Sequence, residues 1–321
     1  TVGGVESAEF DVINDDELRF IVPAGAAGTV DVVLTTVGGL ATLSDAFSYV
    51  VSLDVIEMSW SGMSAQATDG DFNGEVSTVE QGPNGELYIM GYFQDASGEA
   101  SADFVARWNG SQWVGLGSGI NGNGALTCFS YCYYSDLAIA QNGDVYIAGE
   151  FEVSGMIGVQ ALAKWDGATW TSIAADIDGY ISDLVFDNEG SLYVSGVFDN
   201  LGGISTADVI AKWDGTNWSG LGSDGSGDGP LNRQPYAMVV GSDDSLYISG
   251  NFRNAGGVAA ADYLAVWNGA TWSSVGTYSI DEQEFEPYAD SLLIDNSSGA
   301  DMLYIGGCMG WGSENLPIAK Y

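Results

Sequence analysis

The 321-residue chain has no histidine, three cysteines, six prolines, and only seven lysines and arginines against 44 aspartates and glutamates. Without histidine it lacks the usual general base of Ser-His and Cys-His enzymes and the imidazole ligands of many metal sites. The formal net charge of −37 repels phosphate backbones, so we expect no nucleic-acid partner. Three cysteines are too few for a disulfide framework and lack the spacing of a zinc site; a Cys128–Cys132 bridge stays open for an oxidising compartment.

Long apolar runs and helical periodicity are also missing, so we expect no membrane insertion. Glycine is abundant, with 46 residues, and 12% of residues are aromatic, which favours an all-β protein. The chain starts at Thr1 without a signal-like segment, which indicates a processed or partial product. Two explanations of the acidic composition stay open, adaptation to a salty environment and binding of calcium.

A paired-tryptophan motif recurs four times along the chain. Each copy has the form Trp-Asn/Asp-Gly-x-x-Trp, and the copies begin at Trp108, Trp165, Trp213 and Trp267. Asn-Gly and Asp-Gly between two short apolar runs tolerate the positive φ of a tight turn, so each copy predicts a β-hairpin.

A second motif, ending in Tyr-x-x-Gly, alternates with the first. Its tyrosines make five copies: Tyr88, Tyr146, Tyr193, Tyr247 and Tyr304. Each repeat therefore holds four short strands, the content of one propeller blade. For the third repeat we predict strands over 181–187, 191–198, 208–214 and 217–222.

The last repeat lacks its fourth strand, because the chain ends soon after its third. A matching segment stands near the other end, where residues 59–64 align with residues 217–222. Residues 51–321 are therefore predicted to form a five-bladed β-propeller whose last blade is completed by an N-terminal strand, which would leave no exposed sheet edge.

Residues 1–50 have no paired tryptophans and resemble the C-terminal half of an IPT/TIG immunoglobulin-like domain, through the stretches at 16–23, 28–36 and 38–47. A full sandwich of this kind needs roughly 100 residues, so we expect neighbouring domains upstream. The repeats resemble bacterial kelch-like or delta-60-type propeller repeats, through Gly-x-Leu-Tyr-Val-x-Gly-x-Phe and Ile-Ala-Lys-Trp-Asp-Gly. This resemblance implies a secreted, cell-surface or virion-associated protein.

One loop has the spacing of a calcium-binding loop. Asp69, Asp71 and Asn73 alternate, Gly74 permits a sharp turn, and Glu80 stands at the twelfth position, with Glu75 as a substitute ligand. The alternative is an acidic turn without an ion.

Aromatic residues outside the repeat pattern suggest a sugar-binding site. These are Trp311, which we place in a loop, and the insertion with Tyr131, Tyr133 and Tyr134. Rings stack on the apolar faces of sugars while nearby polar groups orient the hydroxyls. Packing of these rings within loops is the alternative. Four tyrosines at the start of the first strands, Tyr134, Tyr180, Tyr236 and Tyr288, either pack or line the central channel.

We assign no catalytic residue, because the acids are spread over all repeats and the sequence marks none as buried among apolar neighbours. Asp103, Asp208 and Asp262, which precede the third strand, are interpreted as loop caps. The sequence predicts a non-enzymatic, extracellular binding or adhesion module that recognises a glycan or a cell-surface protein. A structural spacer in a surface filament or virion is the alternative, and a glycoside-active propeller ranks below both.

Overall fold

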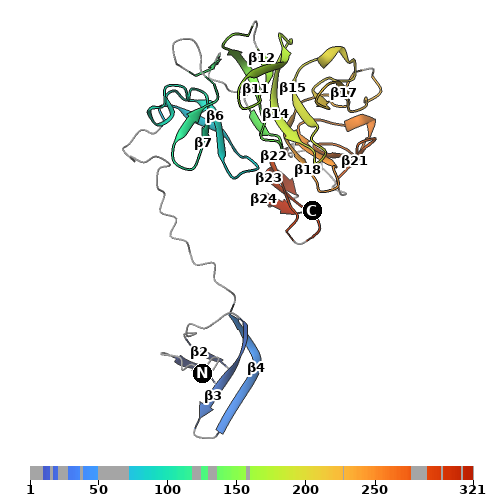
Figure 1. The fold of residues 1–321 in the computed structure, drawn as a ribbon. Coiled ribbons are helices and arrows are strands. Elements are labelled where there is room, and N and C mark those ends of the chain that lie inside the picture. Colours follow the sequence, from blue (N-terminus) through green and yellow to red (C-terminus); the bar gives the residue numbers. More distant parts are fainter. Residues whose placement is uncertain are drawn as a thin grey trace. The chain divides into compact units, whose positions relative to one another are not determined.

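We analysed a computed structural model of the chain, which forms two compact units, residues 1–61 and 62–321. Figure 1 shows the fold. The structure describes residues 10–14, 17–20, 28–36, 39–49, 72–117, 124–128, 136–156, 160–226, 228–275, 288–297, 299–311 and 314–320. In these ranges no helix is long and apolar enough to cross a membrane.

The described strands of the first unit form two antiparallel hairpins. β1 (Phe10–Asn14) pairs with β2 (Glu17–Phe20), and β3 (Gly28–Thr36) pairs with β4 (Gly39–Tyr49). The short alternating strands expected for this segment are confirmed, whereas its IPT/TIG identity stays a prediction.

The described residues of the second unit form five antiparallel sheets, which we number 1 to 5 in chain order. Sheet 1 contains β5 (Glu75–Gln81), β6 (Leu87–Tyr92), β7 (Val105–Trp108) and β8 (Trp113–Gly115). Sheet 2 contains β10 (Asp136–Ile139), β11 (Val145–Val153), β12 (Gln160–Trp165) and β13 (Trp170–Ala175), with β9 (Leu126–Cys128) paired to β11. Sheet 3 contains β14 (Tyr180–Phe186), β15 (Leu192–Val197), β16 (Ile210–Trp213) and β17 (Trp218–Gly220). Sheet 4 contains β18 (Pro235–Val240), β19 (Leu246–Gly250), β20 (Leu264–Trp267) and β21 (Trp272–Ser274), and sheet 5 contains β22 (Tyr288–Asp295), β23 (Met302–Trp311) and β24 (Glu314–Lys320).

The sheets follow one another so that the first strand of each lies beside the first strand of the next (Figure 1). The apolar core lies between neighbouring sheets. Met90, Leu137 and Ile147 belong to one buried cluster between sheets 1 and 2, and sheets 3 and 4 enclose a similar cluster. This stacking of four-stranded sheets by their faces is the blade arrangement of a propeller.

The paired tryptophans form the predicted hairpins. Trp213 lies opposite Trp218, and their ring centroids are 5.0 Å apart. In the turn between them, Asp214 Oδ1 accepts hydrogen bonds from the backbone N–H groups of Thr216 and Asn217, and Gly215 has a φ of +93°. The turn therefore needs the Asp-Gly pair that the sequence repeats.

The Tyr-x-x-Gly motif is explained by a β-bulge in the first strand. In sheet 3 the register shifts between Ile181 and Asp183, opposite Gly196. A Cβ atom on Gly196 would lie 2.1 Å from the carbonyl oxygen of Tyr180, so no larger residue fits. Register shifts at the same place occur in sheets 1, 4 and 5.

The interpretation of the repeated aspartates as loop caps is confirmed. Asp103 Oδ1 accepts a hydrogen bond from the N–H of Asp95 at 2.8 Å, and its Oδ2 accepts one from Gly124, in the lead to sheet 2, at 3.0 Å. Asp208 bonds Asn200 and Gly229 in the same way.

Indole groups connect neighbouring sheets. Trp170 Nε1 donates to the carbonyl of Leu116 in the preceding sheet at 2.8 Å, and Trp272 Nε1 donates to that of Leu221 at 2.7 Å. Trp113 occupies the same place in sheet 1, but its buried Nε1 has no hydrogen-bond partner among the described residues.

The strands of sheet 3 agree with the predicted ranges to within two residues at each end. The placement of Trp311 in a loop is wrong, because β23 continues through this residue and pairs it with Glu314 in a long hairpin. The closing segment 59–64 lies outside the described residues.

Candidate functional site

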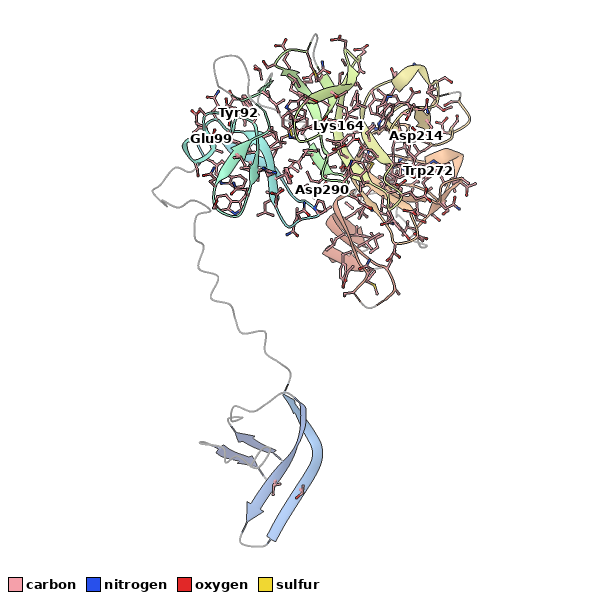
Figure 2. The ribbon with its side chains drawn as sticks, in the orientation of Figure 1. Tyr92, Glu99, Lys164, Asp214, Trp272 and Asp290 are labelled. Atoms are coloured by element: carbon pink, nitrogen blue, oxygen red, sulfur yellow. The ribbon has the colours of Figure 1, made fainter. Side chains whose placement is uncertain are left out.

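A cavity of about 480 Å³ lies where the first strands of all five sheets converge. Its walls carry Thr78 of β5, Asp136 of β10, Asp183 of β14, Tyr236 of β18 and Asp290 of β22. Figure 2 shows Asp290 near the middle of the second unit, whereas Trp272 lies in the outer part of its sheet. The cavity therefore lies at the inner side of the sheets, among their first strands.

The lining follows from the strand register. Thr78, Asp136, Asp183 and Ala237 each pair with the residue directly before the repeated glycine of the second strand. Because side chains alternate between the two faces of a strand, residues at one register position of equivalent sheets face the same space. The position holds Asp in sheets 2 and 3 and three other residue types in sheets 1, 4 and 5, with Ser291 in sheet 5.

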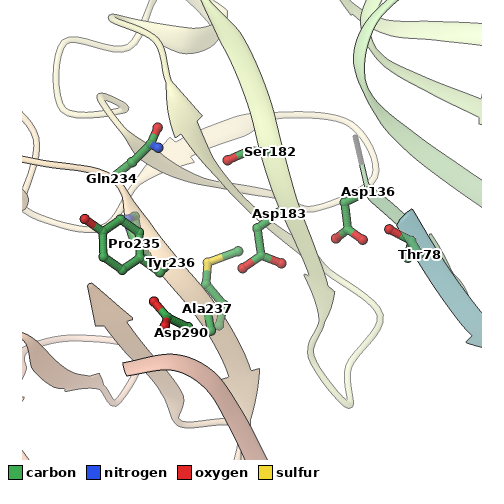
Figure 3. Close-up of a pocket in the computed structure, with 10 residues that line it drawn as sticks. Thr78, Asp136, Ser182, Asp183, Gln234, Pro235, Tyr236, Ala237 and Asp290 are labelled. Atoms are coloured by element: carbon green, nitrogen blue, oxygen red, sulfur yellow. The ribbon is translucent and has the colours of Figure 1, made fainter. Parts of the chain in front are cut away.

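Asp136 and Asp183 stand side by side in the cavity, between Thr78 and the pair Pro235 and Tyr236 (Figure 3). The two carboxyl groups are hydrogen bonded to each other. Asp136 also bonds the hydroxyl of Thr78, and its Oδ2 accepts a hydrogen bond from the backbone N–H of Leu184 at 2.9 Å.

Burial dominates the ionisation of this pair. The pKa of Asp136 is raised to about 6, mainly by loss of hydration and also by the charge of Glu80, while hydrogen bonds from Leu184, Leu137 and Thr78 act in the opposite direction. Burial also raises the pKa of Asp183 well above its usual range, followed by the charge of Asp136 and the bond between the two. Two carboxylates in contact cannot both ionise easily, so these directions favour a pair that shares one proton.

The cavity also contains acceptor atoms without donors. Asp183 Oδ2 and Gln234 Oε1 are buried and have no hydrogen-bond partner among the described residues. A buried acceptor left without a donor costs about 1–3 kcal/mol, so these atoms indicate space for something that donates to them.

Sequence reasoning missed this pair, because it found no acid marked as buried among apolar neighbours. The pairing of first and second strands could have revealed these residues. Asp136 pairs with the residue directly before Gly149, and Asp183 pairs with the residue directly before Gly196. An alignment of first strands against second strands would have placed both side chains in the cavity. Their contact with each other depends on how sheets 2 and 3 pack, which such an alignment does not show.

The residues predicted to bind calcium are only partly described. Asn73 Oδ1 accepts a hydrogen bond from the N–H of Gln94 at 2.7 Å, and Glu75 and Glu80 both lie on β5. Five residues of extended strand separate these two glutamates by about 16 Å, so at most one of them could join an ion near Asn73. Asp69 and Asp71 lie outside the described residues. In the part of the chain that is described, no three His, Cys, Asp or Glu side chains come together as a metal site.

The predicted sugar site is not brought together in the described part of the structure. Tyr131, Tyr133 and Tyr134 lie outside the described residues, and the backbone of Trp311 is in β23. Of the four tyrosines at the start of the first strands, Tyr236 lines the cavity with 43% of its surface exposed.

No family model matches the chain, and neither does any curated protein. Three solved structures are similar at low identity. The extracellular domain of BT4673 from B. thetaiotaomicron is 11% identical with a TM-score of 0.44, over 75% of this chain and 26% of that one. YCF48 bound to D1 peptide is 15% identical with a TM-score of 0.40, over 74% and 63%. PorZ, a surface component of the type-IX secretion system of Porphyromonas gingivalis, is 13% identical with a TM-score of 0.39, over 93% and 37%. The chain thus spans less than two thirds of each of these proteins.

Proposed function

We propose that the chain is a non-enzymatic, extracellular binding module of a larger surface or virion-associated protein, and that its ligand enters the central cavity. The observation that carries this proposal is the lining of that cavity. All five first strands contribute to this lining, four of them through Thr78, Asp136, Asp183 and Ala237 at an equivalent position. Two buried acceptors there have no donor among the described residues. A concave site with a few convergent polar groups is the usual form of a ligand pocket.

The proposal includes a propeller of five blades, with residues 59–64 as the missing fourth strand of the last. The orphan indole N–H of Trp113 supports it. Its counterpart Trp272 bonds the carbonyl of Leu221, and Met63 aligns with Leu221 in sequence. A strand at 59–64 would bring the carbonyl of Met63 to Trp113 and cover the free edge of β24.

Glycoside hydrolysis fits this cavity less well. Two-carboxylate glycosidases hold their carboxyl groups about 5–5.5 Å apart when retaining and about 6.5–9.5 Å apart when inverting, to leave room for the sugar or for water. Asp136 and Asp183 are instead hydrogen bonded to each other, which leaves no such room between them.

Calcium bound by Asp69, Asp71 and Asn73, and glycan contacts by Trp311 and the tyrosines of the 128–134 insertion, remain parts of the proposal. They rest on residue spacing and on aromatic composition.

The test is a binding screen of the purified chain on glycan arrays and on cell surfaces, run with millimolar calcium and with EDTA. Ala237→Trp fills the cavity, and Ser273→Trp adds the same side chain on an exposed part of β21 as a control. We expect binding by the wild type and by the control, and loss with Ala237→Trp. No binding in any arm would favour the structural spacer, and hydrolysis of a bound glycan would favour the enzyme.

A further inference from the structure

We infer that the central cavity binds a primary ammonium group, held by the buried acceptors around Asp136 and Asp183. This inference rests on the proposed function, because it names the chemistry of the ligand for the same cavity.

The first argument is a surplus of acceptors. The cavity is lined by Asp136, Asp183 and Asp290, and its described lining contains no lysine or arginine. Asp183 Oδ2 and Gln234 Oε1 are buried and accept no hydrogen bond from the described residues. A neutral sugar hydroxyl brings one donor, whereas an ammonium group brings three donors and no acceptor.

The second argument is charge. The two aspartates are in contact, and burial raises the pKa of both, which favours a pair that shares one proton and presents about one negative charge rather than two. A single positive charge balances the pair, and Asp290 adds a further carboxyl group to the same lining. A divalent metal ion is a poorer match, because calcium needs about six to eight oxygen ligands, and the described residues contain no group of three His, Cys, Asp or Glu side chains placed to hold a metal ion.

The third argument is the apolar wall. Pro235, Tyr236 and Ala237 face the carboxyl pair across the cavity (Figure 3). The exposed ring of Tyr236 can cover the carbon chain of an alkylammonium ion or contact the charged nitrogen, a contact of about 0.5–2 kcal/mol. The cavity therefore offers acceptors on one side and a hydrophobic surface on the other.

The experiment is isothermal titration calorimetry at pH 7.5 and low salt with four probes. Nα-acetyl-lysine methylamide and glucosamine carry the amine from a peptide source and from a sugar source. Nα-acetyl-norleucine methylamide and N-acetylglucosamine are their uncharged counterparts. We expect at least one amine to bind about tenfold or more tightly than its uncharged counterpart, which corresponds to a charge-assisted hydrogen bond.

Two variants connect the binding to the cavity. Asp183→Asn should weaken amine binding about 10- to 100-fold, while Asp199→Asn, which removes an exposed acid from the loop after β15, should change it less than about twofold. Ala237→Trp should abolish it without touching an acid, which covers the case in which Asp183→Asn fails to fold.

Equal binding of charged and uncharged probes, no effect of Asp183→Asn in a folded protein, or displacement of the amine by micromolar calcium would overturn the inference. If the screen finds a glycan or cell-surface ligand that needs the open cavity while neither amine binds, the inference fails and the proposed function stands. If nothing binds at the cavity, both fail.

Discussion

The outer and inner parts of the sheets differ in how closely their residues repeat from one sheet to the next. At the outer hairpins, sheets 1 to 4 all carry Trp-Asn/Asp-Gly-x-x-Trp, with ring centroids 5.0 to 5.5 Å apart in each pair. At the central cavity the equivalent register position holds Thr78, Asp136, Asp183 and Ala237 in the same four sheets. The paired tryptophans recur because every sheet needs the same outer hairpin. The residues at the cavity position vary, so together they form one surface that no single sheet provides.

The comparison also extends to burial of polar groups. The outer carboxylates are satisfied by their own turns; backbone N–H groups of Thr169 and Ala168 lower the pKa of Asp166, which stays exposed. The inner carboxyls are desolvated, and burial raises the pKa of both Asp136 and Asp183. We therefore expect changes at the outer hairpins to cost stability and changes at the inner pair to gain it.

The largest effect is expected from Trp272→Ala. This side chain is 6% exposed, packs on Trp267 and donates its indole N–H to Leu221, so its removal should lower the free energy of unfolding by about 3–5 kcal/mol. Urea denaturation monitored by circular dichroism measures it. Trp218→Ala, at the equivalent but partly exposed position of sheet 3, should cost clearly less. Equal losses would contradict the view that burial between sheets, rather than the motif itself, sets the energy.

Sequence reasoning was effective where the chemistry is local. The Asp-Gly and Asn-Gly turns, the strand content of each repeat and the capping by Asp103 and Asp208 all depend on residues near in sequence, and the structure has them as predicted. The contact between Asp136 and Asp183 depends on the register of two separate sheets and on how those sheets pack, and composition does not reveal either. Trp311 was misplaced because the glycines on both sides of it, Gly310 and Gly312, favour a loop, whereas β23 continues through Trp311.

A medium effect, of opposite sign, is expected from Asp136→Asn. An amide keeps an acceptor for the N–H of Leu184 but carries no charge to desolvate. The pKa of about 6 in the folded protein, against 3.8 as its ordinary value, makes the ionised carboxyl unfavourable by about 2–3 kcal/mol at pH 7, so the variant should be more stable by up to this amount.

The difference in stability between the wild type and Asp136→Asn should depend on pH. Because the folded state holds its proton more tightly, the wild type should lose stability relative to Asp136→Asn as the pH rises from about 4 to about 6, with little difference below that window. Urea denaturation at pH 4, 5, 6 and 7 measures this, with Asp199→Asn as the control for removing one charge from a chain of net charge −37. A variant less stable than wild type at pH 7 would show that the ionised carboxylate is instead favoured by its hydrogen bonds.

The smallest expected effect is the difference in the free energy of unfolding between Trp113→Phe and Trp272→Phe, two substitutions at equivalent positions of sheets 1 and 4. Trp113 and Trp272 are 3% and 6% exposed, but only Trp272 has a partner for its indole N–H among the described residues. If residues 59–64 close the last blade, the carbonyl of Met63 bonds Trp113 as that of Leu221 bonds Trp272. Trp113→Phe and Trp272→Phe should then lower the free energy of unfolding equally, to within about 0.5 kcal/mol, since each loses one buried hydrogen bond and similar contact area. Urea denaturation of the two variants in parallel measures the difference. A cost for Trp113→Phe smaller by about 1 kcal/mol or more would mean that its N–H is unpaired in the folded protein, and that another segment, or none, completes the ring.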